Sequence, residues 1–220
     1  MKPRPANQTA AMTLTEVLVV IVVLAVLLLV FLPAFISDNP RNPRYFRIQC
    51  VSNLKQIGLA CRIWANDNND KYPMQVSSTN GGAMELIAAG NVAACFQVMS
   101  NELEMPRLLI CPADRNRIPA TSFTNGLNNS NISYFVGLDA DQKNPRVFLS
   151  GDDNFDIGGA EVKSGLLRLS TKAPITWTAA RHKHAGNIGF ADGSVWQMNA
   201  ENLQQELQQT GVVTNRLAIP

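Results

Sequence analysis

The sequence predicts an α+β protein in which a long N-terminal apolar helix precedes a globular domain with an antiparallel β-sheet and extra short helices. Three observations support this fold class. Sixteen consecutive apolar residues run from Val17 to Leu32. The segment from Arg44 to Ala65 carries an apolar stripe with helical spacing. The dipeptide Asp-Gly at 192–193 lies between two short apolar segments, which is typical of a β-hairpin.

The apolar segment is long enough to cross a membrane. The 20 residues from Val17 to Ile36, at ~1.5 Å per residue, form a helix of roughly 30 Å, the thickness of a hydrocarbon core. A removable secretory signal has a shorter apolar region of about 7–15 residues, with small residues at a cleavage site after it. Here the small residues Ala10 and Ala11 come first, and Glu16 opens the apolar segment. We therefore expect the helix to stay in the protein.

This order resembles the prepilin-type signal of type IV pilins and type II secretion pseudopilins, in which a short basic leader is removed and the apolar helix is kept. The resemblance implies cleavage between Ala11 and Met12, where the family usually has glycine and phenylalanine, and methylation of the new amine. It also implies that Glu16 pairs with the N-terminal amine of a neighbouring subunit, since a charge beside hydrocarbon needs a partner. Pro33 corresponds to the proline that kinks many pilin helices.

A second resemblance extends through nearly the whole chain. His182 is followed ten and eleven positions later by Asp192 and Gly193. This spacing is similar to the pseudopilin-like proteins with an H-X9-DG C-terminal motif that are abundant in planctomycetes and verrucomicrobia. Further pieces that resemble this family are Cys50–Gly58, Trp64–Pro73, Cys111–Asp114 and Phe148–Asn154.

The resemblances imply a domain organisation, a location and a set of partners. Residues 1–11 would be a leader peptide, residues 12–36 a transmembrane or filament-core helix, and residues 37–220 a single periplasmic or extracellular domain of pilin-like fold. The chain would pass once through the bacterial inner membrane with its N-terminus in the cytoplasm. The implied partners are other pilin or pseudopilin subunits, the prepilin peptidase and methylase, and the inner-membrane assembly platform.

The charge balance gives no reason to expect a nucleic-acid partner. The full chain has a formal net charge of +2, and loss of Lys2 and Arg4 with the leader leaves 17 basic and 17 acidic residues. Proteins that bind nucleic acid neutralise phosphates with an excess of lysine and arginine. We therefore expect membrane contact, through the apolar helix, and no nucleic acid.

Residue patterns predict the elements of the globular domain. Proline disfavours helix continuation, so the cluster Asp38–Pro43 should interrupt the chain after the apolar helix. An amphipathic helix should follow from Arg44 to about Ala65. Its inward stripe would consist of Cys50, Leu54, Ile57, Cys61 and Trp64. Other expected elements are helices at Ala83–Ala89, Val92–Glu102 and Ala200–Gln209, the last capped by Asn199 and stopped by Gly211, and strands at Arg107–Ile110, Ser133–Val136, Arg146–Leu149 and Ile175–Ala179.

A hairpin is expected around the Asp-Gly dipeptide. Asn187–Phe190 and Val195–Met198 would pair across a type I′ turn, which needs positive φ at both central residues. This register sets Trp196 opposite Gly189, where the ring can cover the bare backbone. Together with Ile175–Ala179 the two strands would form a meander.

His182 and His184 suggest a metal site, with Asp192 as a third ligand. In the expected meander, however, the histidines lie in the turn at one end and Asp192 in the turn at the other, ~13 Å or more apart. The alternative interpretation is structural. In it Arg181 and His182 bond loop carbonyls, and Asp192 supports its own turn.

A calcium site is a weaker possibility in the sequence. Asp152, Asn154 and Asp156 have the alternating oxygen ligands that begin a calcium loop, but Gly158 comes one position late and Lys163 stands where an EF-hand has glutamate. The other explanation of these residues is a series of Asx turns. Calcium is thus a candidate cofactor, and no other cofactor is expected.

Four cysteines suggest disulfide bonding if the domain is exported. Cys50 and Cys61 lie eleven residues apart on one predicted helix, about 16 Å, which is too far for a disulfide. A bond could join either of them to Cys95 or Cys111, or join Cys95 to Cys111. Buried free thiols are the alternative.

The sequence contains no G-x-S-x-G, P-loop or H-E-x-x-H motif, so we expect no enzyme. The leading hypothesis is a pilin-like structural subunit of a type II secretion pseudopilus or type IV pilus-like filament. The rival hypothesis is a membrane-tethered domain that binds a glycan or an exported substrate without polymerising. A signal-anchored hydrolase has only His182, His184 and several aspartates in its favour.

Overall fold

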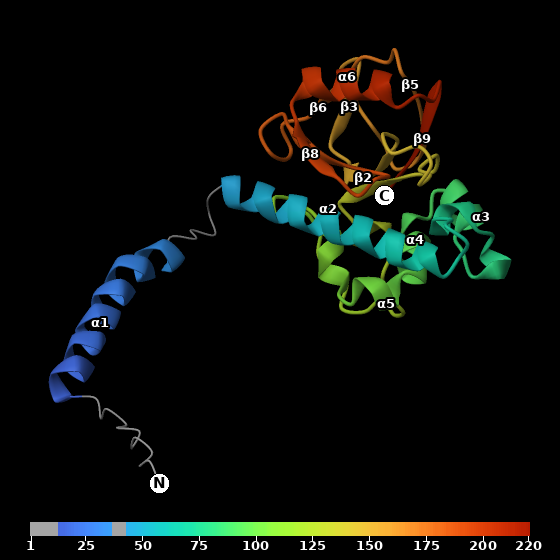
Figure 1. Ribbon diagram of the computed structural model, residues 1–220. Helices are drawn as coiled ribbons and strands as arrows, with labels where there is room; N and C mark the ends of the chain where they lie inside the picture. Colours follow the sequence, from blue (N-terminus) through green and yellow to red (C-terminus); the bar gives the residue numbers. More distant parts are fainter. Residues whose placement is uncertain (1–12, 37–42) are drawn as a thin grey trace, which may run out of the picture. The chain divides into compact units, whose positions relative to one another are not determined.

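The computed structural model describes residues 13–36 and 43–220 (Figure 1). They belong to two compact units, divided after Asn42. The first contains the helix α1 (Leu14–Ile36), and the second contains every other described element. The expected cleavage site at Ala11 and Met12 lies outside the described residues.

Helix α1 is apolar on all sides. The stretch Leu14–Phe31 has the length and apolarity of a membrane span, and none of it is buried within its unit. Thr13 and Glu16 start the helix as a capping box. The backbone N–H of Thr13 donates to the Glu16 carboxylate (2.8 Å), and the N–H of Glu16 donates to Thr13 Oγ1 (3.4 Å). The helix continues through Pro33 to Ile36.

Helix α2 (Pro43–Asn66) confirms the predicted amphipathic helix. Proline is well suited to its first position, where the missing N–H would have no helical partner. The predicted inward stripe is buried, from Cys50 (0% exposed) to Trp64 (7%). After the helix, Asn69 and Asp70 adopt left-handed φ angles of 56° and 58°, the conformation in which many helices end.

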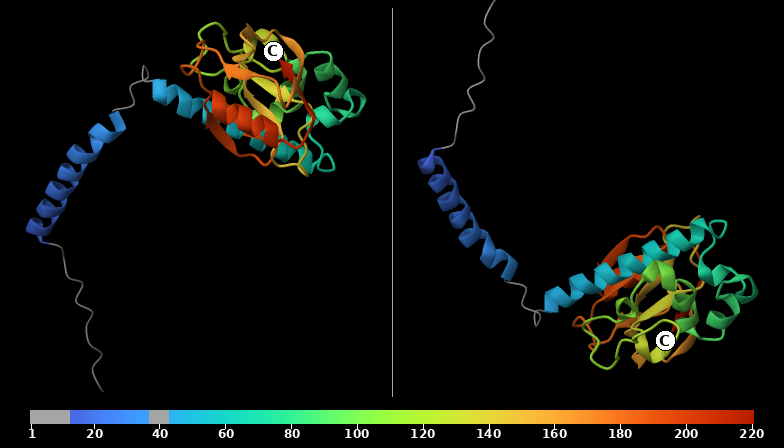
Figure 2. Two further views of the ribbon diagram at one scale, coloured as in Figure 1. Left: turned by 90° about the horizontal axis from the view of Figure 1, so that it is seen from above. Right: turned by 90° about the horizontal axis from the view of Figure 1, so that it is seen from below.

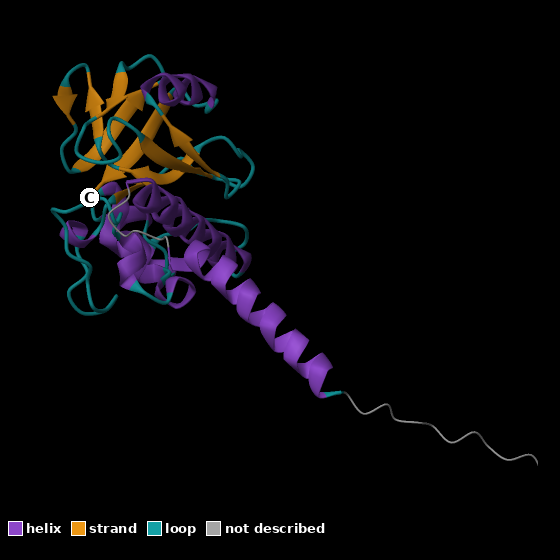
Figure 3. Ribbon diagram, turned by 90° about the vertical axis from the view of Figure 1, so that its left-hand side faces the viewer, coloured by secondary structure: helices purple, strands orange, loops and turns teal. Residues whose placement is uncertain are grey.

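Nine strands among the described residues form two antiparallel sheets (Figures 1 and 3). The larger sheet has the order β5-β9-β1-β2-β7-β8, and the smaller has the order β4-β3-β6. The strands are β1 (Tyr134–Gly137), β2 (Phe148–Asp152), β3 (Phe155–Ile157), β4 (Ala160–Glu161), β5 (Gly165–Ser170), β6 (Ile175–Trp177), β7 (Gly186–Phe190), β8 (Val195–Met198) and β9 (Thr214–Ile219).

Short helices complete the second unit. Seven such described helices lie between α2 and β1. They are the α-helices α3 (Met84–Ala88), α4 (Val92–Val98) and α5 (Ser100–Leu103), and the 3-10 helices η1 (Pro73–Gln75), η2 (Ser78–Asn80), η3 (Pro106–Leu109) and η4 (Asn129–Asn131). Figure 2 shows α3 near the end of α2 remote from Pro43. By contrast, η3 lies by the first half of α2, where Asn53 donates to the carbonyl of Ile110, the residue after η3 (3.1 Å). Helix α6 (Ala200–Gln209) has the predicted bounds, and Asn199 caps it by accepting from the N–H of Asn202 (2.8 Å).

The larger sheet has a hydrophobic core on each face. Figure 3 shows helices on both sides of the strands. Along β1, Tyr134 and Val136 point into the core shared with α2, whereas Phe135 points into the core shared with α6 and the smaller sheet. This alternation follows from the two-residue period of a strand. Because both faces are covered, β1, β2 and β7 are buried at every position. On the α6 side, Gly186 lies so close to the ring of Trp177 that a Cβ atom would overlap it.

The hairpin forms with a register and a turn that differ from the prediction. Trp196 pairs with Ile188, and Val195 pairs with Gly189. The loop contains three residues, because the N–H of Phe190 donates to the carbonyl of Ser194 (2.9 Å). Within it, Gly193 has a positive φ of 85° and Asp192 does not. This is the three-residue turn with a terminal left-handed glycine rather than type I′. Trp196 is therefore half-exposed and does not cover Gly189.

Two further predictions of structure are wrong, and a third is correct only in part. The expected strand at Arg107–Ile110 is the 3-10 helix η3, which starts at Pro106, a residue that cannot donate to a sheet. The expected meander does not form, because β6 pairs with β3 in the smaller sheet and β7 pairs with β2 and β8. The helix expected at Val92–Glu102 is divided into α4 and α5 at Met99.

Candidate functional site

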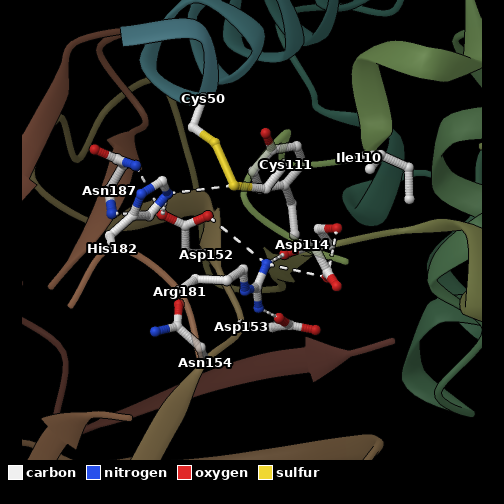
Figure 4. A network of polar contacts seen from close by, with 12 residues as sticks. Cys50, Ile110, Cys111, Asp114, Asp152, Asp153, Asn154, Arg181, His182 and Asn187 are labelled. Carbon is white, nitrogen blue, oxygen red and sulfur yellow. Dashed lines mark hydrogen bonds and ion pairs between the residues drawn. A yellow bond between two sulfur atoms is a disulfide. The ribbon is translucent and has the colours of Figure 1, made fainter. Parts of the chain in front are cut away.

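The candidate site is a buried group of polar side chains around a disulfide (Figure 4). Cys50, on the first half of α2, is bonded to Cys111, in the loop after η3, with a Cα–Cα distance of 5.3 Å. This is one of the pairings that the sequence left open. Cys61 and Cys95 are buried free thiols. Burial raises the pKa of Cys95 to about 12 and that of Cys61 well above its usual range, so both are unreactive.

His182 lies against the disulfide. Its Nε2 is 3.2 Å from Cys111 Sγ and 3.6 Å from Asp152 Oδ2. Arg47 of α2 donates to the backbone carbonyl of His182 (2.6 Å). Burial is the main cause that lowers the pKa of His182, with Asp152 opposing it, so the ring is neutral near pH 7. His184, the other histidine, is turned away, with Nδ1 3.2 Å from the carbonyl of Trp177.

The backbone around His182 is unusual. Three consecutive residues, His182, Lys183 and His184, have positive φ angles of 51°, 56° and 58°. Residues other than glycine rarely adopt this backbone conformation, and they keep it only where their contacts impose it. Here the contacts of His182 with α2 and with the disulfide supply that constraint.

Asp152, at the end of β2, is fully buried. Its Oδ2 accepts two hydrogen bonds from Asn187 of β7, one from the backbone N–H and one from Nδ2, both 2.8 Å long. Its Oδ1 has no exposed surface and no hydrogen-bond partner among the described residues, and the guanidinium of Arg181 lies 3.8 Å from it. One carboxylate oxygen is thus fixed, while the other has lone pairs available.

Arg181 connects this group to two further carboxylates. Its guanidinium is paired with Asp153 and lies 3.6 Å from Asp114 and 3.8 Å from Asp152. It also donates to the carbonyl of Ser133 (2.9 Å). Arginine stays charged when buried because its pKa is so high, so the ion pairs offset its loss of hydration. The predicted bonding of Arg181 to a loop carbonyl is therefore present, and it is one contact among several.

A cleft of about 420 Å³ opens beside this group. Its polar lining includes Asp114, Arg117, Asp153, Asn154 and Arg181. Arg117 is paired with Asp153 (2.6 Å) and Asp114 (3.4 Å). Arg117 and Arg181 thus have carboxylate partners, whereas Arg115, the third arginine of the lining, has no ion pair among the described residues. The cleft therefore offers hydrogen-bonding groups together with the positive charge of Arg115.

The remaining parts of the H-X9-DG motif lie elsewhere. Arg62 of α2 donates to the carbonyl of Asp192 (2.5 Å), whereas Arg47 of the same helix binds His182. These arginines are fifteen positions apart, about 22 Å along the helix. The Asp192 carboxylate accepts from the N–H of Ser194 (2.8 Å), within its own turn. The backbone carbonyls of His182 and Asp192 therefore accept hydrogen bonds from opposite halves of α2.

The candidate calcium ligands have different partners. Asp152 is engaged by Asn187, as above, and Asp156 Oδ1 accepts from the N–H of Gly159 in the turn between β3 and β4 (2.7 Å). Asn154 donates to the carbonyl of Thr178 (3.4 Å). Each carboxylate supports its own part of the fold, which is the Asx-turn interpretation for Asp156. Calcium binding stays a prediction.

Sequence reasoning missed the convergence of these residues. The segments that resembled the H-X9-DG family, Cys50–Gly58, Cys111–Asp114, Phe148–Asn154 and the pair at 181–182, all contribute to one cluster. The available signal was that each segment carries a polar or sulfur-containing side chain within an apolar context. Comparison with protein-family models, with curated proteins and with solved structures finds no match to this chain.

Proposed function

We propose that this protein is a pilin-like structural subunit. In this proposal a prepilin peptidase removes residues 1–11 and methylates Met12. The apolar helix first anchors the chain in the inner membrane and then forms the core of a type II secretion pseudopilus or type IV pilus-like filament. The second unit faces the periplasm or the exterior. The observation that carries the proposal is the surface of α1, which is apolar all round with Glu16 as its one charged residue.

A helix of this kind is not stable in water by itself. A helix that is apolar on every side is surrounded either by lipid or by other apolar helices. The environments of a membrane and of a filament core both meet this requirement, so the same helix can serve before and after assembly.

Glu16 provides a contact that could guide the helix from the membrane into the filament core. In the single chain its carboxylate is bound to the first turn of its own helix by Thr13. A carboxylate retains lone pairs beyond those hydrogen bonds and can accept a charged amine as well. The amine of a neighbouring subunit, freed by cleavage, is the partner that we propose.

The second unit has the features of a stable structural module. It has two hydrophobic cores, a disulfide between α2 and a loop, and buried charges that are paired with one another. We expect no catalytic activity from it. The cleft of about 420 Å³ favours the second candidate function, a membrane-tethered binding domain that does not polymerise.

Replacement of Glu16 separates the two candidates. In cells of the source organism or a host with a pilus assembly machine, Glu16→Gln should insert into the membrane normally and be lost from the sheared filament fraction. Thr13→Ala is the matched control, because it weakens the same capping box and keeps the carboxylate. It should still assemble. Wild-type levels of assembly by Glu16→Gln would contradict the filament role and favour the tethered domain.

A further inference from the structure

We propose that Cys50, Cys111, Asp152 and His182 form a redox-gated zinc site. In the oxidised protein the two sulfurs are bonded to each other and bind no metal. When the disulfide is reduced, the two thiolates, the imidazole Nε2 and a carboxylate oxygen bind one Zn²⁺. This inference is independent of whether the protein assembles into filaments.

The four donor groups lie close enough together to form a tetrahedral site after reduction. One candidate ligand atom from each of the four residues lies within 4.8 Å of all the others. Zinc bonds of ~2.3 Å to sulfur and ~2.0 Å to nitrogen or oxygen place the ligands of a tetrahedron roughly 3.3–3.8 Å apart. His182 Nε2 lies 3.2 Å from Cys111 Sγ. It lies 3.6 Å from Asp152 Oδ2, which places the Asp152 carboxylate beside the imidazole. The ligand oxygen would be Oδ1, because Asn187 occupies Oδ2. Reduction lets the sulfurs separate by side-chain rotation.

The donors are in suitable chemical states. A metal binds the neutral imidazole, and burial keeps His182 in that form near pH 7. Asp152 has one oxygen without a hydrogen bond in a fully buried position, although buried oxygens normally have partners. Asn187 holds the other oxygen by two hydrogen bonds, as outer residues commonly do for the carboxylate ligands of a metal.

The charges balance when the metal is present. Two thiolates and one carboxylate carry three negative charges, and Zn²⁺ leaves one. The oxidised site carries the same single negative charge, that of Asp152, with the guanidinium of Arg181 3.8 Å away. Buried charges need such pairing. The site would therefore form within the existing cluster without a new unpaired charge.

The chemistry requires a two-electron reductant, which is a dithiol in the cell. Thiol–disulfide exchange breaks the bond between Cys50 and Cys111, transfers two electrons and two protons to them, and leaves the dithiol as a disulfide. Binding of Zn²⁺ then releases the two thiol protons. Exchange with another disulfide reverses these steps: that disulfide takes up two electrons, and two protons from water, to become a dithiol, the bond between Cys50 and Cys111 is restored, and Zn²⁺ is released. In vitro a phosphine can replace the dithiol and is converted to its oxide with oxygen from water.

The test uses the untagged full chain in detergent, without oxygen, with and without a phosphine reductant. Co²⁺ is the probe, because tetrahedral Co²⁺ with thiolate ligands gives intense charge-transfer and visible bands. The reduced protein should bind one Co²⁺ with these bands and release it to one equivalent of Zn²⁺. Zn²⁺ should also raise the thermal midpoint of the reduced protein and leave that of the oxidised protein unchanged.

Variants assign the ligands. Asn187→Ala should weaken Co²⁺ binding by about 10–100-fold, and His182→Ala should weaken it at least as much. His184→Ala and Cys61→Ala, which change a histidine and a thiol outside the cluster, should bind Co²⁺ as the wild type does. Reduced wild type that is folded but shows no thiolate bands would overturn the proposal. So would equal binding by oxidised protein, or binding that His182→Ala leaves unchanged.

Discussion

The disulfide between Cys50 and Cys111 should contribute a large part of the stability of the second unit. A disulfide restricts the unfolded chain, and the effect grows with the loop that it closes. The sequence separation here is 61, for which the chain-entropy relation gives about 4 kcal/mol at 25 °C. In a domain of this size each kcal/mol shifts the thermal midpoint by roughly 2–4 °C. The double variant Cys50→Ala/Cys111→Ala should therefore unfold roughly 8–16 °C below the wild type.

Tryptophan fluorescence during heating provides the assay. Trp64, Trp177 and Trp196 all belong to the second unit, so the signal does not report on the apolar helix in detergent. Reduction of the wild type in the presence of a chelator should lower the midpoint by a similar amount. Reduction of the double variant should leave its thermal midpoint unchanged, since no other disulfide occurs among residues 43–220. Unchanged midpoints after reduction of the wild type would refute the reasoning.

Three further predictions concern single side chains. Arg181→Ala should lower the free energy of unfolding by about 3–5 kcal/mol in denaturant titrations, because it leaves buried carboxylates without a partner. Arg216→Ala is the control, because the more exposed ion pair of Arg216 with Asp139 should contribute about 1 kcal/mol or less. In the oxidised protein burial lowers the pKa of His182 below its ordinary value of 6.5. As the pH falls below about 6.5, the unfolded chain therefore binds more protons than the folded chain, and the free energy of unfolding decreases. His182→Gln should flatten this part of a midpoint-against-pH curve, and an unchanged slope would contradict the cause. Gly186→Ala should cost roughly 1–3 kcal/mol by overlap with an indole ring, while Gly58→Ala in α2, which has ordinary contacts, should be neutral or stabilising.

Local patterns predicted the local elements well. The predictions of helices α2 and α6 were correct because apolar spacing and helix caps depend only on residues a few positions apart. The failure at Arg107–Ile110 has a local cause as well, since Pro106 favours the start of a helical turn over a strand. The turn at Asp192 was predicted with the wrong length, because the bond between Phe190 and Ser194 depends on how β7 is fixed by its neighbours.

Strand order could not be predicted from the sequence. Strand β9 lies between β1 and β5, and such pairings join residues more than forty positions apart, which no short pattern encodes. The same reason explains the meander that did not form. Strand β6 pairs with β3, which lies about twenty positions earlier, and β7 pairs with β2 rather than with β6.

The candidate site was predictable in its residues and not in its assembly. Cys50, Cys111, Asp152 and His182 were each noticed in the sequence, but for three different reasons. Their meeting depends on α2, β2, the loop after η3 and the left-handed turn at 182–184 together. The sequence placed the histidines and Asp192 at opposite ends of a meander and gave no sign that His182 lies beside Asp152.

The central claim is that this chain is a processed prepilin-like subunit, and the mass of its N-terminus tests it most directly. Protein extracted from its own membranes should begin at Met12 with a methylated amine, one residue before the capping box of Thr13 and Glu16. An intact chain beginning at Met1 would contradict the claim, because the amine that we propose as the partner of Glu16 would not exist.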